Sequence, residues 1–204
     1  SPDGSRIVYT PSSVGTVYYA TMSGYPNLAF FGANGPASPV TSTVFGGTQW
    51  ARSGLAWSGD GTTIIAAAGN NPSGLMYIST NYGQAFSILP VYVQSDTSDY
   101  RPRSFTNVSV NSNATIILAS YNPNSTADSN QLVRRYFYGQ AGAYSNFWTE
   151  TPTGSGNGLL VPSSTGSYKS ITSYLGDIQI ICDGLSGSVF TSYDQGYSWY
   201  VVKV

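Results

Sequence analysis

Three basic residues stand at matching places in a repeated sequence pattern, and together they could bind an anion. Arg52, Arg103 and Lys169 are each followed by Ser and then by a short stretch typical of a β-strand. If three such strands run side by side around an axis, the cations are aimed at one mouth of the central channel. Arg offers a carboxylate two parallel N–H donors, whereas Lys is a point charge that cannot form this fork.

The alternative for these cations is a purely structural role at the ends of strands. The segment QSDTSDYRPR places Asp96 and Asp99 close to Arg101 and Arg103 in sequence. Surface ion pairs of this kind are common and contribute little to stability. Both interpretations remain open from the sequence.

Three aromatic residues in loop-like segments are further candidates for ligand contact: Trp50 in GGTQWARS, Tyr100 in SDYRPR and Tyr121 in SYNPNST. Sugars stack on such rings, and exposed Tyr is frequent in recognition surfaces. Packing between neighbouring sheets is the alternative, and for Trp50 it is at least as well indicated.

Several classes of chemistry are excluded or disfavoured by the residue types that the chain lacks. It contains no His and one Cys, so imidazole-based metal sites, His-based triads and intrachain disulfides are excluded. Cys182 lies in the apolar run IQIICDG, which predicts a buried and inert thiol. The segments 60–63 and 96–99 lack the density of oxygen ligands of a calcium loop. We therefore expect no metal and no cofactor.

The amino-acid composition of the chain limits the kinds of partner that it is expected to bind. Only 8% of the 204 residues are charged, against about 25% in ordinary soluble domains, and the net charge is −1. This gives no overall field for nucleic acid, and no apolar run reaches the roughly 18 residues of a membrane helix. We expect neither nucleic-acid binding nor membrane insertion. Protein neighbours in an assembly, or a surface glycan, are the expected partners.

Three N-glycosylation sequons begin at Asn107, Asn113 and Asn124. Asn107 falls inside a predicted strand and is a poor acceptor. Asn124 lies in the polar segment YNPNSTADSN and is the best candidate, with Asn113 second.

The sequence predicts that these residues are positioned by many short β-strands. Runs rich in Val, Ile, Tyr, Phe and Thr are separated by Gly, Pro, Asn and Asp, and helical periodicity is absent. The predicted strands are 6–10, 16–22, 28–32, 54–58, 63–69, 75–80, 86–91, 105–110, 115–121, 132–138, 147–151, 169–175, 177–183, 188–194 and 198–204.

The strands group into repeats. RSGLAWSGDGTTIIAAA, RSFTNVSVNSNATIILAS and KSITSYLGDIQIICDG share a basic residue with Ser, a short strand, a turn and an Ile-rich strand. Two further related phrases begin at Ser79 and Ser192, 113 residues and two units apart, so the period is about 56 residues. Four strands per unit at this period predict an all-β, β-propeller fold of four-stranded antiparallel blades.

The expected blades span approximately 1–49, 50–100, 101–157 and 158–204. The first unit begins at the turn after its first strand, so the sequence holds about three and three-quarter blades. We interpret it as a single propeller domain or an excerpt of a larger one.

The two phrases also carry a family resemblance. TSYDQGYSW places Ser192, Asp194, Gly196 and Trp199 in the pattern S-x-D-x-G-x-x-W, and STNYGQAF places Ser79, Asn81, Gly83 and Phe86 in the same four slots. This pattern resembles the Asp-box, or bacterial neuraminidase repeat, of sialidase-like propellers. A looser likeness is to repeat proteins of large DNA viruses. The motif is expected to stabilise the hairpin between the third and fourth strands of a blade.

The resemblance implies a fold more firmly than a function, because propellers host many activities. Sialidases carry three Arg on the axis, a Tyr–Glu nucleophile pair and an Asp acid/base. Here one of the three cations is Lys169, and Glu150, the only Glu, has no evident Tyr partner. We therefore expect no catalytic residues and no enzyme.

The favoured function is a structural or recognition propeller on a virion or cell-surface exterior that presents loops to a glycan or protein. A secreted glycan-binding lectin and a sialidase-like hydrolase are the alternatives.

Overall fold

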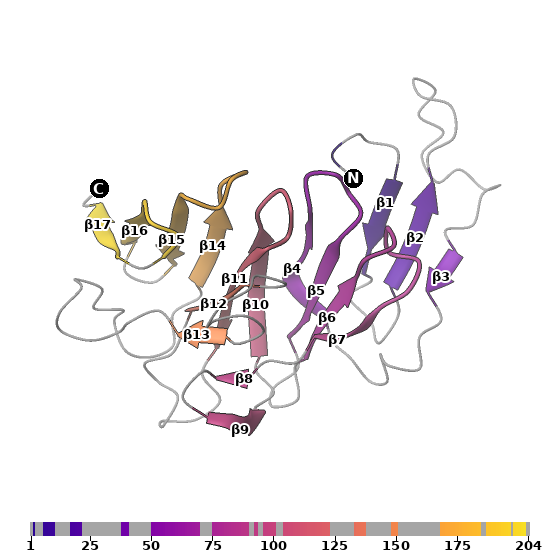
Figure 1. The fold of residues 1–204 in the computed structure, drawn as a ribbon, viewed down its shortest axis with the longest axis horizontal. Helices are drawn as coiled ribbons and strands as arrows, with labels where there is room; N and C mark the ends of the chain where they lie inside the picture. Colours follow the sequence, from indigo (N-terminus) through magenta and orange to yellow (C-terminus); the bar gives the residue numbers. More distant parts are fainter. Residues whose placement is uncertain are drawn as a thin grey trace.

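The computed structural model describes the residues of the strands and of most of the turns between them. These are residues 2, 6–10, 17–21, 38–40, 50–69, 75–89, 92–93, 96–100, 104–122, 133–137, 148–150, 168–184, 187–196 and 198–202. They form 17 β-strands (Figure 1). Within this part of the chain there is no helix that is long and apolar enough to cross a membrane.

Apart from β8 and β9, the strands form four antiparallel groups in which strands adjacent in sequence are paired. The first sheet contains β1 (Arg6–Tyr9), β2 (Val17–Thr21) and β3 (Ser38–Val40). The second contains β4 (Trp50–Trp57), β5 (Ile64–Ala68), β6 (Met76–Ser79) and β7 (Ser87–Leu89). The third contains β10 (Ser104–Val110), β11 (Ile116–Asn122), β12 (Val133–Phe137) and β13 (Trp148–Glu150). The fourth contains β14 (Tyr168–Thr172), β15 (Gln179–Asp183), β16 (Val189–Ser192) and β17 (Tyr200–Val202).

The second and third sheets are joined through their first strands. Ser53 of β4 and Asn107 of β10 face each other in a parallel pairing, and β14 also lies against β10. The first strands of the second, third and fourth sheets therefore stand side by side, and β4 and β10 run in the same direction.

Two short strands were not anticipated from the sequence. β8 (Tyr92–Val93) and β9 (Asp96–Tyr100) form a hairpin that attaches to β13 through Trp148 and Val93. β3 was also not predicted, and the predicted strand 28–32 lies outside the described residues. The other predicted strands are confirmed, with ends that differ by a few residues.

The packing of the second sheet shows why β5 is apolar at every position. All five residues of β5 are buried, because one side faces the first sheet and the other faces the third. Ile64, Ala66 and Ala68 pack with Val8 and Val17 of the first sheet. The alternate residues Ile65 and Ala67 pack with a set from the third sheet: Phe105, Val108, Ile117 and Ala119. A strand that is buried on both faces loses the alternation of apolar and polar residues.

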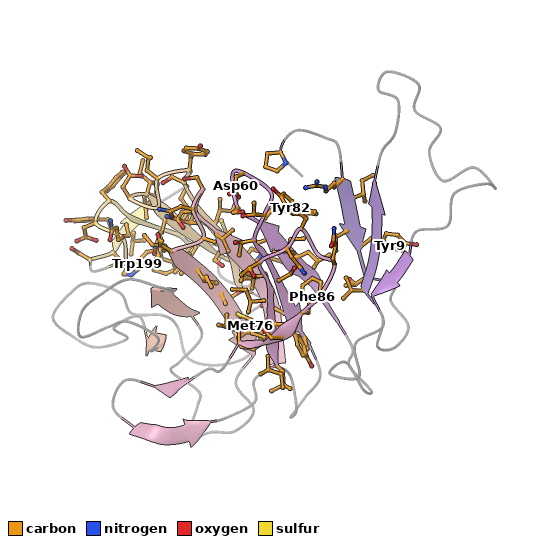
Figure 2. The ribbon with its side chains drawn as sticks, turned by 45° about the vertical axis from the view of Figure 1, so that its right-hand side comes forward. Tyr9, Asp60, Met76, Tyr82, Phe86 and Trp199 are labelled. Carbon is orange, nitrogen blue, oxygen red and sulfur yellow. The ribbon has the colours of Figure 1, made fainter. Side chains whose placement is uncertain are left out.

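A contact between the first two sheets lies at the edge of this packing. The guanidinium of Arg6 stands 3.7 Å from the ring centroid of Tyr82, a cation–π geometry. Figure 2 shows Tyr82 and Phe86 on the side of the second sheet that faces the first. The sheets are therefore stacked through side chains rather than joined edge to edge here.

Among the described residues, the fourth sheet is packed mainly on one face. Gln179, Ile181, Phe190 and Trp199 are buried, whereas Ile171, Tyr200 and Val202 on the other side are 62%, 59% and 45% exposed. Cys182 is exposed as well, so the prediction of a buried thiol is wrong. The apolar sequence around it was interpreted correctly as a strand, but no sheet within the described part of the chain packs on the side of the strand that carries Cys182.

Candidate functional site

The motif 192–199 folds into a hydrogen-bonded turn between β16 and β17. The Ser192 hydroxyl donates to Asp194 Oδ1 at 2.8 Å and accepts from the Gly196 backbone N–H at 2.7 Å. Asp194 Oδ1 also accepts from the Ser198 N–H at 2.8 Å. The Ser and Asp side chains thus satisfy backbone donors that the turn leaves without a strand partner.

The earlier copy of the motif makes the same bonds between β6 and β7. The Ser79 hydroxyl donates to Asn81 Oδ1 at 2.9 Å and accepts from the Gly83 N–H at 2.9 Å. Asn81 Oδ1 accepts from the Ala85 N–H at 3.0 Å. Asn replaces Asp without loss of the pattern, because its amide oxygen accepts as a carboxylate oxygen does.

The glycine and aromatic slots have separate roles. Gly83 and Gly196 have φ of 86° and 83°, the left-handed region that favours glycine. Phe86 is buried against the first sheet. Trp199 is 2% exposed, and its Nε1 donates to the Gly196 carbonyl at 3.2 Å. Every residue of the motif therefore serves the fold.

The turns gather at one end of the sheets, here called the turn end. Within a sheet, the Tyr82 N–H donates to the Thr62 carbonyl, and the Gln195 N–H donates to the Asp177 carbonyl. Between sheets, the Gly59 N–H donates to Ser112 O at 2.6 Å, and the Ser112 N–H donates to Tyr174 O at 2.7 Å. Backbone hydrogen bonds thus connect the turns of the second, third and fourth sheets.

The carboxylates described at this end are engaged in turn hydrogen bonds. The Ser58 hydroxyl donates to Asp60 and lowers the pKa of that carboxyl, with help from the Thr62 N–H and hydroxyl. The Ser173 hydroxyl in the same way lowers the pKa of Asp177. Both carboxylates are ionised at neutral pH. A general acid needs the opposite shift. No group of three His, Cys, Asp or Glu residues that could hold a metal occurs in the described part of the chain.

The other end of the sheets holds three of the predicted ligand contacts. Trp50 is the first residue of β4, Tyr121 is near the end of β11 and Lys169 is near the start of β14. Lys169 is exposed, and its Nζ donates to the Thr106 carbonyl at 3.2 Å. One residue further along, Asn107 Oδ1 accepts from both the N–H and the hydroxyl of Ser170 at 2.7 Å.

The three predicted cations precede the turns of their sheets by different numbers of residues. Ser58, Asn111 and Ser173 make the same hydrogen bond to the start of the next strand. Arg52, Arg103 and Lys169 precede these residues by six, eight and four positions respectively. Irregularities in the pairing of β4 and β10 absorb only part of this difference. Whether the three side chains converge on one ligand therefore stays a prediction.

Of the remaining candidate residues, some are located by the strand that contains them and others lie outside the described residues. Arg52 lies in β4, Tyr100 in β9 and Glu150 at the end of β13. Arg103 and Asn124 lie outside the described residues. Asn113 is exposed in the turn 111–116, and its Oδ1 accepts from the N–H and hydroxyl of Thr115.

The sequence analysis did not identify a cluster of buried polar side chains between the third and fourth sheets. The buried atoms Ser109 Oγ, Thr172 Oγ1 and both amide atoms of Gln179 have no hydrogen-bond partner among the described residues. Thr172 pairs with Gln179 across the sheet, and Ser109 stands two residues beyond Asn107, as Thr172 does beyond Ser170. The sequence did contain a signal for this cluster, because Gln179 occupies the repeat position that is apolar in the other repeats, where it is Ile64 and Ile117.

Comparison with known proteins supports the fold. No family model matches the chain, and no curated protein matches it by sequence. Among solved structures it is similar to a GH74 enzyme from Niastella koreensis, with 16% identity and a TM-score of 0.53. It is also similar to TolB from Acinetobacter baumannii, with 12% identity and a TM-score of 0.56, and to Hsv2 from Kluyveromyces lactis, with 8% identity and a TM-score of 0.56.

These alignments cover nearly all of the chain and part of each neighbour. The chain is covered to 98%, 99% and 98%, but it spans 24% of the GH74 enzyme, 41% of TolB and 57% of Hsv2. GH74 and TolB are β-propeller proteins, and at these identities the likeness concerns the fold alone. Repeated four-stranded antiparallel sheets with β-propeller structural neighbours give this chain a β-propeller fold.

Proposed function

We propose that the chain is a non-enzymatic structural or recognition propeller of the Asp-box type, exposed on a virion or cell surface. Its loops bind a glycan or a protein neighbour. The single observation that carries the proposal is the use of the described side-chain carboxylates: Asp60, Asp177 and Asp194 are each hydrogen-bonded within a turn. These hydrogen bonds lower the pKa of Asp60 and of Asp177, whereas a general acid needs a raised pKa.

The structural neighbours are compatible with a catalytic and with a non-catalytic function. They include a GH74 enzyme and also TolB, a non-enzymatic propeller. One neighbour, YCF48, has been solved bound to the D1 peptide, at 10% identity and a TM-score of 0.50. Peptide recognition on this fold supports the proposal without identifying a partner for this chain.

The end of the sheets opposite the turn end is the favoured recognition surface. The turn end is occupied by hydrogen bonds that hold the sheets together. Trp50, Tyr121 and Lys169 are positioned at the other end by β4, β11 and β14. A Trp, a Tyr and a Lys at these strand positions are residue types that suit a glycan that bears a carboxylate or sulfate.

The experiment measures binding of residues 1–204 to an array of sialylated, sulfated and neutral glycans. The variants are Tyr121→Ala and Lys169→Ala, with Tyr174→Ala as the matched control, because Tyr174 is a 72% exposed tyrosine at the turn end. We expect binding that weakens at least about tenfold in the first two variants and is unchanged in the control. Loss of binding in Tyr174→Ala alone would contradict this placement of the surface. Absence of any glycan binding would remove glycans and leave a protein neighbour as the partner.

The lectin alternative makes the same prediction for Lys169 but requires a secreted protein in which Trp50, Tyr100 and the three cations converge on one open pocket. The hydrolase alternative requires turnover that depends on Glu150.

A further inference from the structure

Strands β10 and β14 lie side by side where the third and fourth sheets meet. Hydrogen bonds fix their alignment at two points. Asn107 Oδ1 accepts from the N–H and the hydroxyl of Ser170 at 2.7 Å. At the turn end, the Ser112 N–H donates to the Tyr174 carbonyl at 2.7 Å. The residues between these two points therefore lie alongside each other in the two strands.

Two hydroxyl groups face each other within this contact. Side chains that are two residues apart in a strand lie on the same face of the sheet. Ser109 therefore shares the face of β10 that carries Asn107, and Thr172 shares the face of β14 that carries Ser170. Because Asn107 and Ser170 bind each other, the two faces are turned toward one another. Ser109 Oγ and Thr172 Oγ1 are buried and have no hydrogen-bond partner among the described residues.

The amide of Gln179 lies on the same side as these hydroxyls. Gln179 is the residue of β15 directly opposite Thr172, so both side chains are on the face turned toward the third sheet. Its side chain is 0% exposed, and neither Oε1 nor Nε2 is hydrogen-bonded within the described part of the chain. Ser109, Thr172 and Gln179, here called the polar cluster, thus bring four buried polar atoms into one contact.

The contact between the second and third sheets shows that these three positions adjoin. Counted from the turn hydrogen bonds that the repeats share, the corresponding residues there are apolar. They are Ala56, Val110 and Ile117, in the places of Ser109, Thr172 and Gln179 respectively. Ala56 and Val110 pack against the core cluster that contains Ile117. Three places that form one apolar contact are therefore all polar in the next contact.

The surroundings of the polar cluster are apolar and closed to solvent. Leu118 is opposite Ser109 in the third sheet, and Ile181 is opposite Ser170 in the fourth. Leu118 is 0% exposed and Ile181 is 1% exposed. Polar atoms left without partners in such surroundings are costly, and nearly all buried polar groups in native proteins bind protein groups or ordered water.

We propose that the polar cluster is a binding site for water, in which about one or two buried water molecules join the Gln179 amide to the hydroxyls of Ser109 and Thr172. The water takes the place that apolar side chains fill between the second and third sheets. The site lies apart from the proposed recognition surface and does not depend on the proposed function.

The chemistry of the polar cluster favours water over an ion. Gln179 Nε2 donates, Oε1 accepts, and each hydroxyl can do both. A buried water needs about two to four such partners and serves both kinds. A metal cation would be held by oxygens alone and repelled by the amide N–H groups. An anion would need charged donors or several N–H groups, and the polar cluster is uncharged.

The first test is a crystal structure of the protein at a resolution that shows ordered water. We expect a water oxygen at about 3 Å from the Gln179 amide and from the hydroxyl of Ser109 or Thr172. An amide that binds only protein groups, or an ion in this position, would overturn the proposal. This test uses the wild type and does not rely on a variant that must fold.

The second test counts long-lived water in solution by oxygen-17 magnetic relaxation dispersion. The cluster variant makes the contact apolar, as it is between the second and third sheets, through Ser109→Ala, Thr172→Val and Gln179→Leu. We expect it to lose about one or two long-lived water molecules relative to the wild type.

A matched control separates this loss from a general effect of the substitutions. It carries the same three changes at exposed positions: Ser87→Ala, Thr80→Val and Gln84→Leu. We expect the control to keep the wild-type number of long-lived waters. The same number in the wild type, the control and the folded cluster variant would show that the polar cluster holds no water, contrary to the proposal.

Discussion

The hydroxyl of Ser192 accepts a 2.7 Å hydrogen bond from the Gly196 N–H, and Ser79 accepts the same bond from Gly83 at 2.9 Å. Two turns that are 113 residues apart in sequence therefore have one geometry. Both turns also bind the preceding turn of their own sheet, through Tyr82 and Gln195. The repeated phrase is explained by the need to close the same hairpin twice.

Removal of the Asp194 side chain should destabilise the fold. Asp194→Ala leaves the Ser192 hydroxyl and the Ser198 N–H without their acceptor, so we expect a loss of about 1–3 kcal/mol in the free energy of unfolding. Asp194→Asn copies Asn81 and should cost much less. Urea unfolding of both variants checks this. Equal losses would contradict the equivalence of the two turns.

Replacement of Gln179 by Leu should stabilise the protein. Both amide atoms are buried and unpaired among the described residues, whereas the corresponding Ile64 and Ile117 are apolar. We expect about 1–2 kcal/mol of added stability from Gln179→Leu, measured by urea unfolding. Gln84→Leu, at an exposed glutamine, is the control and should change little. Destabilisation by Gln179→Leu would mean that the hydrogen bonds of the amide, those to bound water included, outweigh the apolar packing of Leu.

Acid should weaken the turns. Hydrogen bonds lower the pKa of Asp60 and of Asp177 below the ordinary value of 3.8. Their contribution to stability is therefore fully present above that value and is lost as the pH falls through the lowered folded-state pKa. We expect the free energy of unfolding to decline on acidification below about pH 4.

Substitution of Asp60 and Asp177 tests whether these two carboxylates cause the loss of stability in acid. Asp60→Asn with Asp177→Asn should flatten the decline, while Asn113→Asp, at the matching place of the third turn, should steepen it. Unfolding curves between neutral and acid pH give the comparison. An unchanged decline in the double variant would assign the acid sensitivity elsewhere.

An exterior protein should carry glycans on its accessible sequons. We expect hexose-containing mass increments on Asn124 or Asn113 in the natural protein, and none on Asn107. The Asn107 side chain accepts two hydrogen bonds from Ser170 between sheets. Intact mass before and after endoglycosidase treatment measures this. Bare Asn113 and Asn124 would contradict a glycosylated surface component.

Much of the fold could be predicted from the sequence because each strand carries its own local signal. β-branched and aromatic runs mark the strands, and glycine marks turns such as those at Gly83 and Gly196, where φ is positive. β8 and β9 could not be predicted in this way, because β9 is polar and β8 has two residues, and the pair depends on the attachment of β8 to β13. The blade number and boundaries remain predictions.

The candidate site was less predictable because it depends on relations between strands. Sequence similarity aligned Arg52, Arg103 and Lys169, but the pairing of β4 and β10 contains irregularities that sequence similarity does not reveal. The environment of Cys182 depends on which face another sheet covers, and the apolar run around it carries no information about that.

Turnover is the most direct test of the central claim that this propeller binds without catalysis. Residues 1–204 and Glu150→Gln are incubated with sialosides and with neutral and sulfated oligosaccharides, and the products are followed by mass spectrometry. The account predicts that every glycan keeps its mass in both samples, including any glycan that binds. Cleavage by the wild type that is lost in Glu150→Gln would contradict it and establish a hydrolase.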